Sequence, residues 1–164
     1  MASDSLQTFY FASGCFWGTE YYFQKLNGVV STTAGYTGGC VFFPTYLQVC
    51  TGETGHVEAV KVVYDEKIIS EDALVRLFFE THDFTQKNGQ GPDIGSQYLS
   101  RIYYTTDSQK KTAEKYVKQL AEKGYNVTTE ILPADLFWEA EEYHQKYYSN
   151  RNSRPYCHSY KKIF

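Results

Sequence analysis

Hydrophobic and polar positions along the chain follow the two periods of regular secondary structure. Short apolar or alternating segments predict strands over residues 8–12, 29–34, 56–64, 98–104 and 126–132. Apolar positions spaced three and four residues apart predict helices over residues 16–26, 71–81, 106–124 and 135–148. Periodicity is absent from residue 149 onward, so we expect residues 149–164 to form an irregular, mobile tail.

The order of these segments indicates the fold class. Strands alternate with helices, but the connections are uneven and the strands are short and partly amphipathic, unlike the continuous apolar strands of a doubly wound fold. We therefore expect an α+β fold, a two-layer α/β sandwich with a mixed sheet and ferredoxin-like elements. At 164 residues the chain fits one domain, residues 1–164, around a single core.

Cys15 stands where the first strand meets the first helix. The first N–H groups of a helix lack internal partners and carry the positive end of its dipole, which favours a thiolate there. Phe16 and Trp17 follow at once and could begin an apolar pocket. The competing interpretation is packing, because free cysteine is among the most buried residue types.

Glu58 lies in the strand predicted over residues 56–64. Because side chains alternate along a strand, Glu58 shares its face with Val60 and Val62. Burial disfavours the ionised carboxylate and raises its pKa, which makes Glu58 a candidate proton donor. Alternatively, Glu58 reaches water at the end of the strand.

Two long connections that contain glycine, residues 35–55 and 82–97, are too long for ordinary turns, and such loops are often functional. The first of them has neither the G-K-[ST] nor the G-x-G-x-x-G pattern of a phosphate cradle, which excludes ordinary nucleotide binding there.

Composition and net charge exclude several classes of function. The formal charge is -3 with both signs interspersed, so neither a nucleic-acid surface nor a polybasic membrane patch is expected. No apolar run has membrane-spanning length, and residues 1–5 lack the features of a secretory signal, so we expect a cytoplasmic protein. Aromatic residues make up 18% of the chain, which predicts an aromatic-rich interior and cleft.

The four cysteines are Cys15, Cys40, Cys50 and Cys157, and no two form a C-x-x-C motif. This spacing argues against a zinc ribbon and a thioredoxin-type pair, and it favours unpaired thiols or a catalytic pair. We expect Cys50 to be a buried structural thiol.

Five segments together carry a family resemblance. They are G-C-F-W-G-T-E at 14–20, A-G-Y-T-G-G at 34–39, P-T-Y at 44–46, V-C-T-G-E-T-G-H-V-E-A-V at 49–60 and Q-G-P-D-I-G-S-Q-Y at 90–98. In order and spacing they resemble the signature segments of the A-type peptide methionine sulfoxide reductases, which act on the S epimer. The resemblance extends from about residue 9 to residue 157.

The resemblance implies thiol-dependent reduction of methionine S-sulfoxide, free or in proteins, and thus repair of oxidised proteins. Cys15 would attack the sulfoxide sulfur while protonated Glu58 donates to its oxygen, since an oxide is a poor leaving group. The hydroxyls of Tyr46 and Tyr98 would hold that oxygen, and Asp93 would support them. Phe16 and Trp17 would receive the methyl group of the substrate.

The resemblance also implies how the enzyme is regenerated. Cys15 would become a sulfenic acid, which a second thiol converts to a disulfide. Cys157, in a P-Y-C segment similar to the family's recycling segment, is the expected resolving residue, and Cys40 is its rival. Thioredoxin or a similar dithiol protein would reduce the disulfide. No bound cofactor or metal is implied, and we expect a monomer.

Two other functions remain open from the sequence. Cys15 could pair with His56 or Glu58 as the nucleophile of an acyl transferase or hydrolase. Alternatively, the chain could be a non-catalytic binding module with an aromatic groove. The chain also departs from the family pattern at Val41-Phe42-Phe43, an apolar loop where a polar, proline-containing loop is usual, which bears on the choice of peptide substrate.

Overall fold

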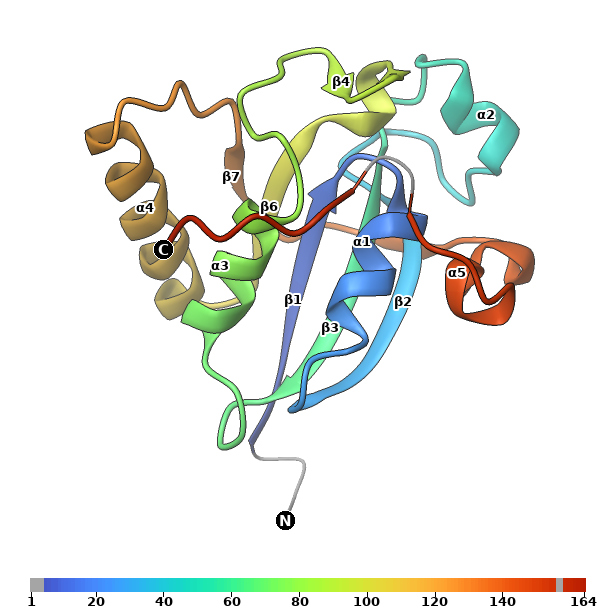
Figure 1. Cartoon of the computed structure of the whole chain (residues 1–164). Coiled ribbons are helices and arrows are strands. Elements are labelled where there is room, and N and C mark those ends of the chain that lie inside the picture. The colour runs from blue at the N-terminus through green and yellow to red at the C-terminus, as the bar shows by residue number, and fades with distance from the viewer. Residues whose placement is uncertain (1–4, 156–157) are drawn as a thin grey trace.

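A six-stranded sheet forms the centre of the computed structural model, which describes residues 5–155 and 158–164 (Figure 1). Its strand order is β7-β6-β1-β3-β2-β8. The strands are β1 (Leu6–Ser13), β2 (Val29–Thr37), β3 (Val57–Asp65), β6 (Ser100–Tyr104), β7 (Glu130–Pro133) and β8 (Phe137–Glu139). Strands β6 and β7 are parallel and the other pairs antiparallel, so the expected mixed sheet and α+β class are confirmed.

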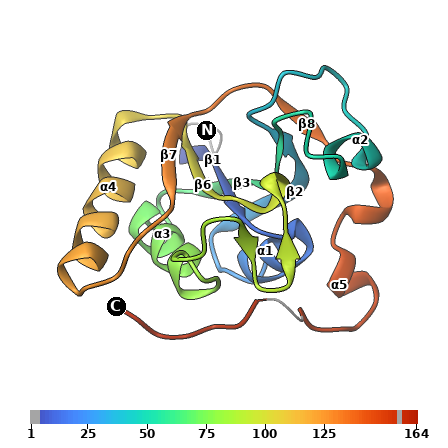
Figure 2. The same cartoon turned by 90° about the horizontal axis from the view of Figure 1, so that it is seen from above.

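Three helices lie against one face of this sheet (Figure 2). They are α1 (Phe16–Phe23), α3 (Glu71–Glu80) and α4 (Asp107–Glu122). The shorter helices α2 (Tyr46–Cys50) and α5 (Tyr147–Asn150) lie beside the β2–β8 edge. A separate ribbon of β4 (Gly89–Gln90) and β5 (Asp93–Ile94) is followed by the 3₁₀ turn η2 (Ser96–Tyr98).

Side chains that accept the first unpaired N–H groups fix the starts of α3 and α4. Ser70 Oγ accepts from Ala73 N at 3.1 Å, and Thr106 Oγ1 accepts from Gln109 N at 3.1 Å. Each cap of this kind stabilises a helix by about 1 kcal/mol. Both helices therefore begin where the sequence predicts.

The core lies between the sheet and the three helices and is rich in aromatic residues. Its fully buried members include Phe9, Phe11, Val60, Val62, Leu74, Phe78 and Leu120. Full burial of a side chain of this size contributes about 1.5–3 kcal/mol. The core holds α1 on β1 and β3, so it fixes the turn that carries Cys15.

The expected helix over residues 135–148 is wrong. The segment contains β8, then the 3₁₀ turn η3 (Glu142–His144), and only then α5. Phe137 and Trp138 pair with β2, and Lys146 has a φ of 50°, which ends any helix before α5. Gln145 bonds both Ala34 N and Ala34 O through its side-chain amide, so tertiary contacts override the helical spacing.

The last described residues lie along α3. Glu80 accepts from Ile163 N at 2.8 Å, Phe164 N at 3.4 Å and the Tyr160 hydroxyl at 3.3 Å. His158 is buried, and its Nε2 donates to Ser13 O at 2.7 Å. Mobility of residues 149–164 in solution stays a prediction.

Among residues 5–155 and 158–164, no helix is long and apolar enough to cross a bilayer.

Candidate active site

The site lies at the end of the molecule opposite the N-terminus, where β1 ends and β3 begins (Figure 1). Cys15 is the N-cap residue of α1 and is buried. Gly14 precedes it with a φ of 94°, and a Cβ there would lie 2.5 Å from the Cβ of Gln90. Only glycine fits this turn, which sets the direction of the thiol.

Glu58 is 1% exposed, so the burial predicted from strand alternation is confirmed. Its Oε1 accepts from Phe16 N, the first N–H of α1, at 3.1 Å. Its Oε2 is buried and has no hydrogen-bond partner among the described residues. Burial raises the pKa of Glu58 well above its usual value, and the charges of Cys15 and Asp93 raise it further, while the Phe16 N–H lowers it.

The position of the Glu58 proton follows from these contacts. Because Oε1 already accepts an N–H, the neutral acid carries its proton on Oε2. The structure thus provides an unpaired acidic O–H close to Cys15.

Tyr46, Tyr98 and Asp93 lie around Glu58. Burial raises the pKa of both phenols, and the nearby charge of Glu58 raises both further; Asp93 also raises that of Tyr98. Both tyrosines therefore stay protonated and can donate hydrogen bonds at any physiological pH. The Tyr46 hydroxyl also lies within hydrogen-bond reach of the Cys50 thiol.

Glu141 fixes the position of Tyr46. Its two carboxylate oxygens accept from the Tyr36 hydroxyl at 2.8 Å and from Tyr46 N at 2.9 Å. Burial opposes its ionisation, but the hydrogen bonds from Tyr46 N, from its own backbone N–H and from the Tyr36 hydroxyl, together with the charge of His144, lower the pKa of Glu141. Glu141 therefore joins β2 to the start of α2.

Phe16 is fully buried, while Trp17 is half-buried and held from two sides. The Trp17 indole N–H donates to His144 Nδ1 at 2.9 Å, and its ring stacks on Tyr147 with centroids 3.6 Å apart. His144 is fully buried, and burial lowers its pKa. Because Nδ1 accepts, neutral His144 carries its proton on Nε2, which has no partner in the described part of the chain.

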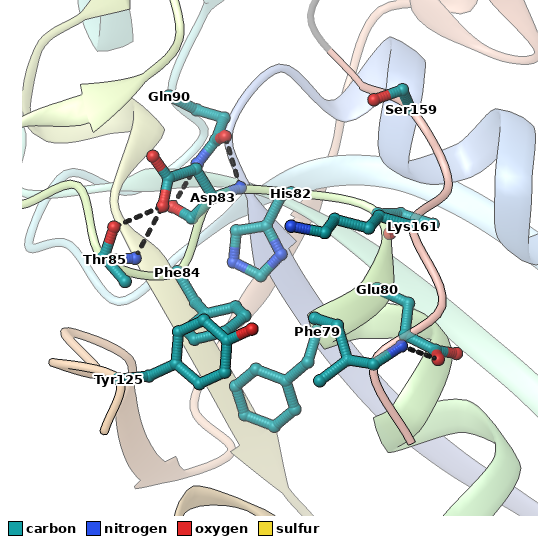
Figure 3. A pocket seen from close by; sticks show the side chains of 12 residues that line it. Phe79, Glu80, His82, Asp83, Phe84, Thr85, Gln90, Tyr125, Ser159 and Lys161 are labelled. Atoms are coloured by element: carbon teal, nitrogen blue, oxygen red, sulfur yellow. Dashed lines mark hydrogen bonds between the residues drawn. The ribbon is translucent and has the colours of Figure 1, made fainter. Parts of the chain in front are cut away.

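A cavity of about 560 Å³, whose lining residues include Gln90 and Asp83 (Figure 3), adjoins the Cys15 turn through Gln90. Gln90 forms part of its wall and bonds the backbone N and O of Asp83 at 2.6 and 2.8 Å. The Cβ of Gln90 packs against Gly14, so this cavity wall supports the turn that carries Cys15.

The remaining cysteines lie in different surroundings. Cys40 and Cys50 are exposed, so the expectation of a buried, structural Cys50 is wrong. Cys50 ends the short helix α2, which faces solvent on this side. Cys157 lies outside the described residues.

Five of the residues predicted from sequence are thus brought together: Cys15, Glu58, Tyr46, Tyr98 and Asp93. Sequence reasoning missed Glu141, His144 and Tyr147. These residues are three positions apart, as on one face of a helix, so the sequence predicts that they pack in a helix. This spacing and the many aromatic residues nearby were the signals that could have pointed to the site.

A model of the family described as peptide methionine sulfoxide reductase matches residues 7–163. The chain belongs to this family. A relative from Ruthia magnifica subsp. Calyptogena magnifica, named peptide methionine sulfoxide reductase MsrA, is 47% identical over 152 residues, which cover 93% of this chain and 91% of the relative.

Solved structures agree with membership of the peptide methionine sulfoxide reductase family. Reduced Mxr1 from Saccharomyces cerevisiae superposes with a TM-score of 0.90 at 34% identity, covering 96% of this chain and 93% of that chain. Mxr1 in complex with Trx2 superposes with a TM-score of 0.66 at 27% identity, covering 96% and 91%. The two-layer fold and the order of its elements are therefore those of this family.

Proposed function

We propose that this protein reduces methionine S-sulfoxide, in proteins or free, with Cys15 as the nucleophile and Glu58 as the proton donor. Reduction of methionine sulfoxide in peptides is the activity for which the relatives are named. The observation that carries the residue assignment is the unpaired Oε2 of buried Glu58, close to Cys15.

In the first step the Cys15 thiolate attacks the sulfoxide sulfur while Glu58 Oε2–H gives its proton to the sulfoxide oxygen. Tyr46 and Tyr98 donate to the same oxygen, where negative charge develops. Asp93 supports this arrangement through the charge it places near Glu58 and Tyr98. The new bond between the Cys15 sulfur and the substrate sulfur then breaks as the protonated oxygen shifts from the substrate sulfur to the Cys15 sulfur, which leaves methionine and a sulfenic acid on Cys15.

Phe16 and Trp17 form the apolar side of the site. A methyl group on the substrate sulfur can pack on these rings, whereas a charged or hydroxylated group would lose its hydration there without a partner. The hydrogen bond from Trp17 to His144 and the stacking on Tyr147 hold the indole in place before substrate arrives.

Regeneration needs a second thiol, for which we propose Cys157. Its thiol displaces hydroxide from the sulfenic acid, giving a Cys15–Cys157 disulfide and water. A dithiol such as thioredoxin then reduces that disulfide; the solved complex of the related Mxr1 with Trx2 supports this partner class. The overall reaction converts sulfoxide and dithiol to thioether, disulfide and water.

We also make proposals on cofactors, metals, oligomeric state and location in the cell. We propose that no cofactor or metal takes part; among the described residues, no group of three His, Cys, Asp or Glu side chains could hold a metal ion. A monomeric, cytoplasmic protein that binds no nucleic acid and no membrane remains our prediction.

A single turnover tests the proposal. Reduced protein is mixed with one equivalent of N-acetyl-methionine S-sulfoxide, and methionine formed, thiols lost and the disulfide pair are measured by mass spectrometry. We expect one thioether formed, two thiols lost and a Cys15–Cys157 bond, with no product from Cys15→Ser. A bond from Cys15 to Cys40 or Cys50 would contradict the role of Cys157, and product from Cys15→Ser would contradict the nucleophile.

A further inference from the structure

An exposed aromatic cluster, Phe42, Phe43 and Trp138, lies beside the site. Phe42 is 69% exposed and Phe43 is 80% exposed. Their rings contact the Trp138 ring, with centroids 5.8 and 4.6 Å apart. Exposed large aromatic residues that contact one another mark an interaction surface more often than packing.

The backbone under this cluster is fixed by His56, which is buried. Gly39 N donates to His56 Nδ1 at 3.1 Å, so the ring carries its proton on Nε2, which donates to Val41 O at 2.7 Å. A second contact, from Cys40 N to Thr54 O at 3.0 Å, holds the same loop. These hydrogen bonds hold the backbone that leads into Phe42 and Phe43.

Phe43 itself has a φ of 50°, in the left-handed region that bulky side chains rarely adopt. Burial of the ring does not account for this conformation, because the ring is exposed and contacts Trp138. Strain of this kind persists at positions that serve function.

Sheet register connects the cluster to the site. Trp138 pairs with Tyr36 on β2, and Tyr36 pairs with Glu58 on β3, so the three residues form one row across three strands. Directly opposite residues point to the same face, and neighbouring strands are about 4.8 Å apart. Trp138 therefore lies roughly 10 Å from Glu58, the length of about three residues of extended peptide.

The loop that carries Phe42 and Phe43 lies in a long stretch of the chain without charged residues. Residues 26–52, which include the loop and α2, contain no Asp, Glu, Lys or Arg. Leu47 on α2 is exposed as well, which extends the apolar surface on the side of Tyr46. A segment that binds over the loop and α2 gains apolar contact there, while Glu139, next to Trp138 on β8, is an exposed carboxylate.

We propose that the aromatic cluster binds the substrate polypeptide two or three residues from its oxidised methionine and favours apolar side chains at those positions. The occupant is an extended, apolar polypeptide segment, as found in unfolded proteins. The proposal rests on the proposed function, because the oxidised methionine must occupy the Cys15–Glu58 site.

Two short peptides test this directly. Both carry a central methionine S-sulfoxide; one has Leu two residues away on each side and the other has Ser. With dithiothreitol as reductant, we expect kcat/KM to be about tenfold higher for the Leu peptide. In Phe42→Ser/Phe43→Asn, which keeps a residue that tolerates positive φ, the preference should fall to about twofold or less.

Two controls distinguish loss of the peptide preference from loss of folding or of the basic activity. Val30→Ser replaces an exposed apolar side chain near the far end of β2 and should keep the tenfold preference. N-acetyl-methionine S-sulfoxide is too short to reach the cluster, so both variants should reduce it at the wild-type rate, which also shows that they are folded.

An unchanged preference in Phe42→Ser/Phe43→Asn, or equal kcat/KM for both peptides in the wild type, would overturn the proposal. A variant that keeps the peptide preference but has a raised KM for thioredoxin would also overturn it, since the cluster would then serve the reductant. Failure of the wild type on every sulfoxide, including the N-acetyl compound, would instead contradict the proposed function.

Discussion

The two oxygens of the Glu58 carboxyl have different roles. Oε1 accepts the first N–H of α1 and thereby fixes the side chain, while Oε2 is buried without a partner among the described residues. An unpaired buried polar atom costs about 1–3 kcal/mol, and proteins tolerate such costs mainly where function needs them. The same burial that costs stability keeps the acid protonated.

The two tyrosines offer the next test at the level of single residues. Tyr46→Phe and Tyr98→Phe each remove one donor to the sulfoxide oxygen, and we expect each to lower kcat about tenfold. The double variant should lose about 10³-fold, because no second hydroxyl then compensates.

The measurement is single-turnover formation of methionine, with Tyr125→Phe as the matched control that leaves the rate unchanged. Tyr125 lies at the cavity behind the site and is exposed. A double variant no slower than the singles would exclude a shared role for the two hydroxyls.

At the level of elements, the segment from β8 to α5 completes the site. It supplies Glu141 to the start of α2 and His144 to Trp17. Neither contact is visible from local spacing, because both depend on residues about a hundred positions earlier.

His144→Leu tests this contribution. The change removes the acceptor of the Trp17 N–H and leaves the indole less fixed, so we expect KM for N-acetyl-methionine S-sulfoxide to rise about fivefold to tenfold while kcat falls less. Steady-state kinetics measure this. In a protein that already carries Trp17→Phe, His144→Leu should change KM little further. If His144→Leu raises KM equally with and without Trp17→Phe, the effect would instead come from general destabilisation.

Much of the fold and of the site could be predicted from sequence, for physical reasons that differ by element. Strand alternation placed Glu58 on the buried face of β3, and apolar spacing located the starts of α3 and α4, because these signals are local. Residues 135–148 could not be predicted this way, since Gln145 and Trp138 find partners on β2.

The meeting of Cys15, Glu58 and the tyrosines also depends on tertiary structure. Cys15 ends the β1–α1 turn, Glu58 begins β3, and Tyr98 ends a 3₁₀ turn after the separate ribbon. Only the motif resemblance predicted that these positions meet. The exposure of Cys50 could not be predicted either, because helix α2 is too short to give a periodic signal.

At the level of the whole molecule, the C-terminal residues connect distant parts of the fold. His158 contacts the Ser13 carbonyl, two residues before Cys15, and its ring occupies the space that a side chain at Gly18 would need. Beyond it, the chain is held on α3 by Glu80, and Lys123 Nζ donates to Ile163 O at 2.9 Å.

Glu80→Ala tests how firmly this end is attached. The variant loses the acceptor for three hydrogen bonds, so residues 160–164 should detach more often and trypsin should cut after Lys161 or Lys162 about tenfold faster. Limited proteolysis with mass spectrometry measures the rate. Lys123→Ala loses one bond and should show a smaller increase, whereas equal rates in all three proteins would show that Glu80 does not hold the tail.

The pH dependence of single-turnover methionine formation tests whether Glu58 donates the proton. In the proposed mechanism Cys15 attacks as a thiolate, so we expect the rate to rise with pH at first. The mechanism also requires Glu58 to be protonated, so the rate should fall again as pH rises through the raised pKa of Glu58.

Glu58→Gln should be slower by about 100-fold or more and should lack that alkaline fall, while Glu53→Gln, an exposed neighbour in sequence, should match the wild type. A Glu58→Gln variant that keeps the wild-type rate, or keeps the alkaline fall, would contradict proton donation by Glu58.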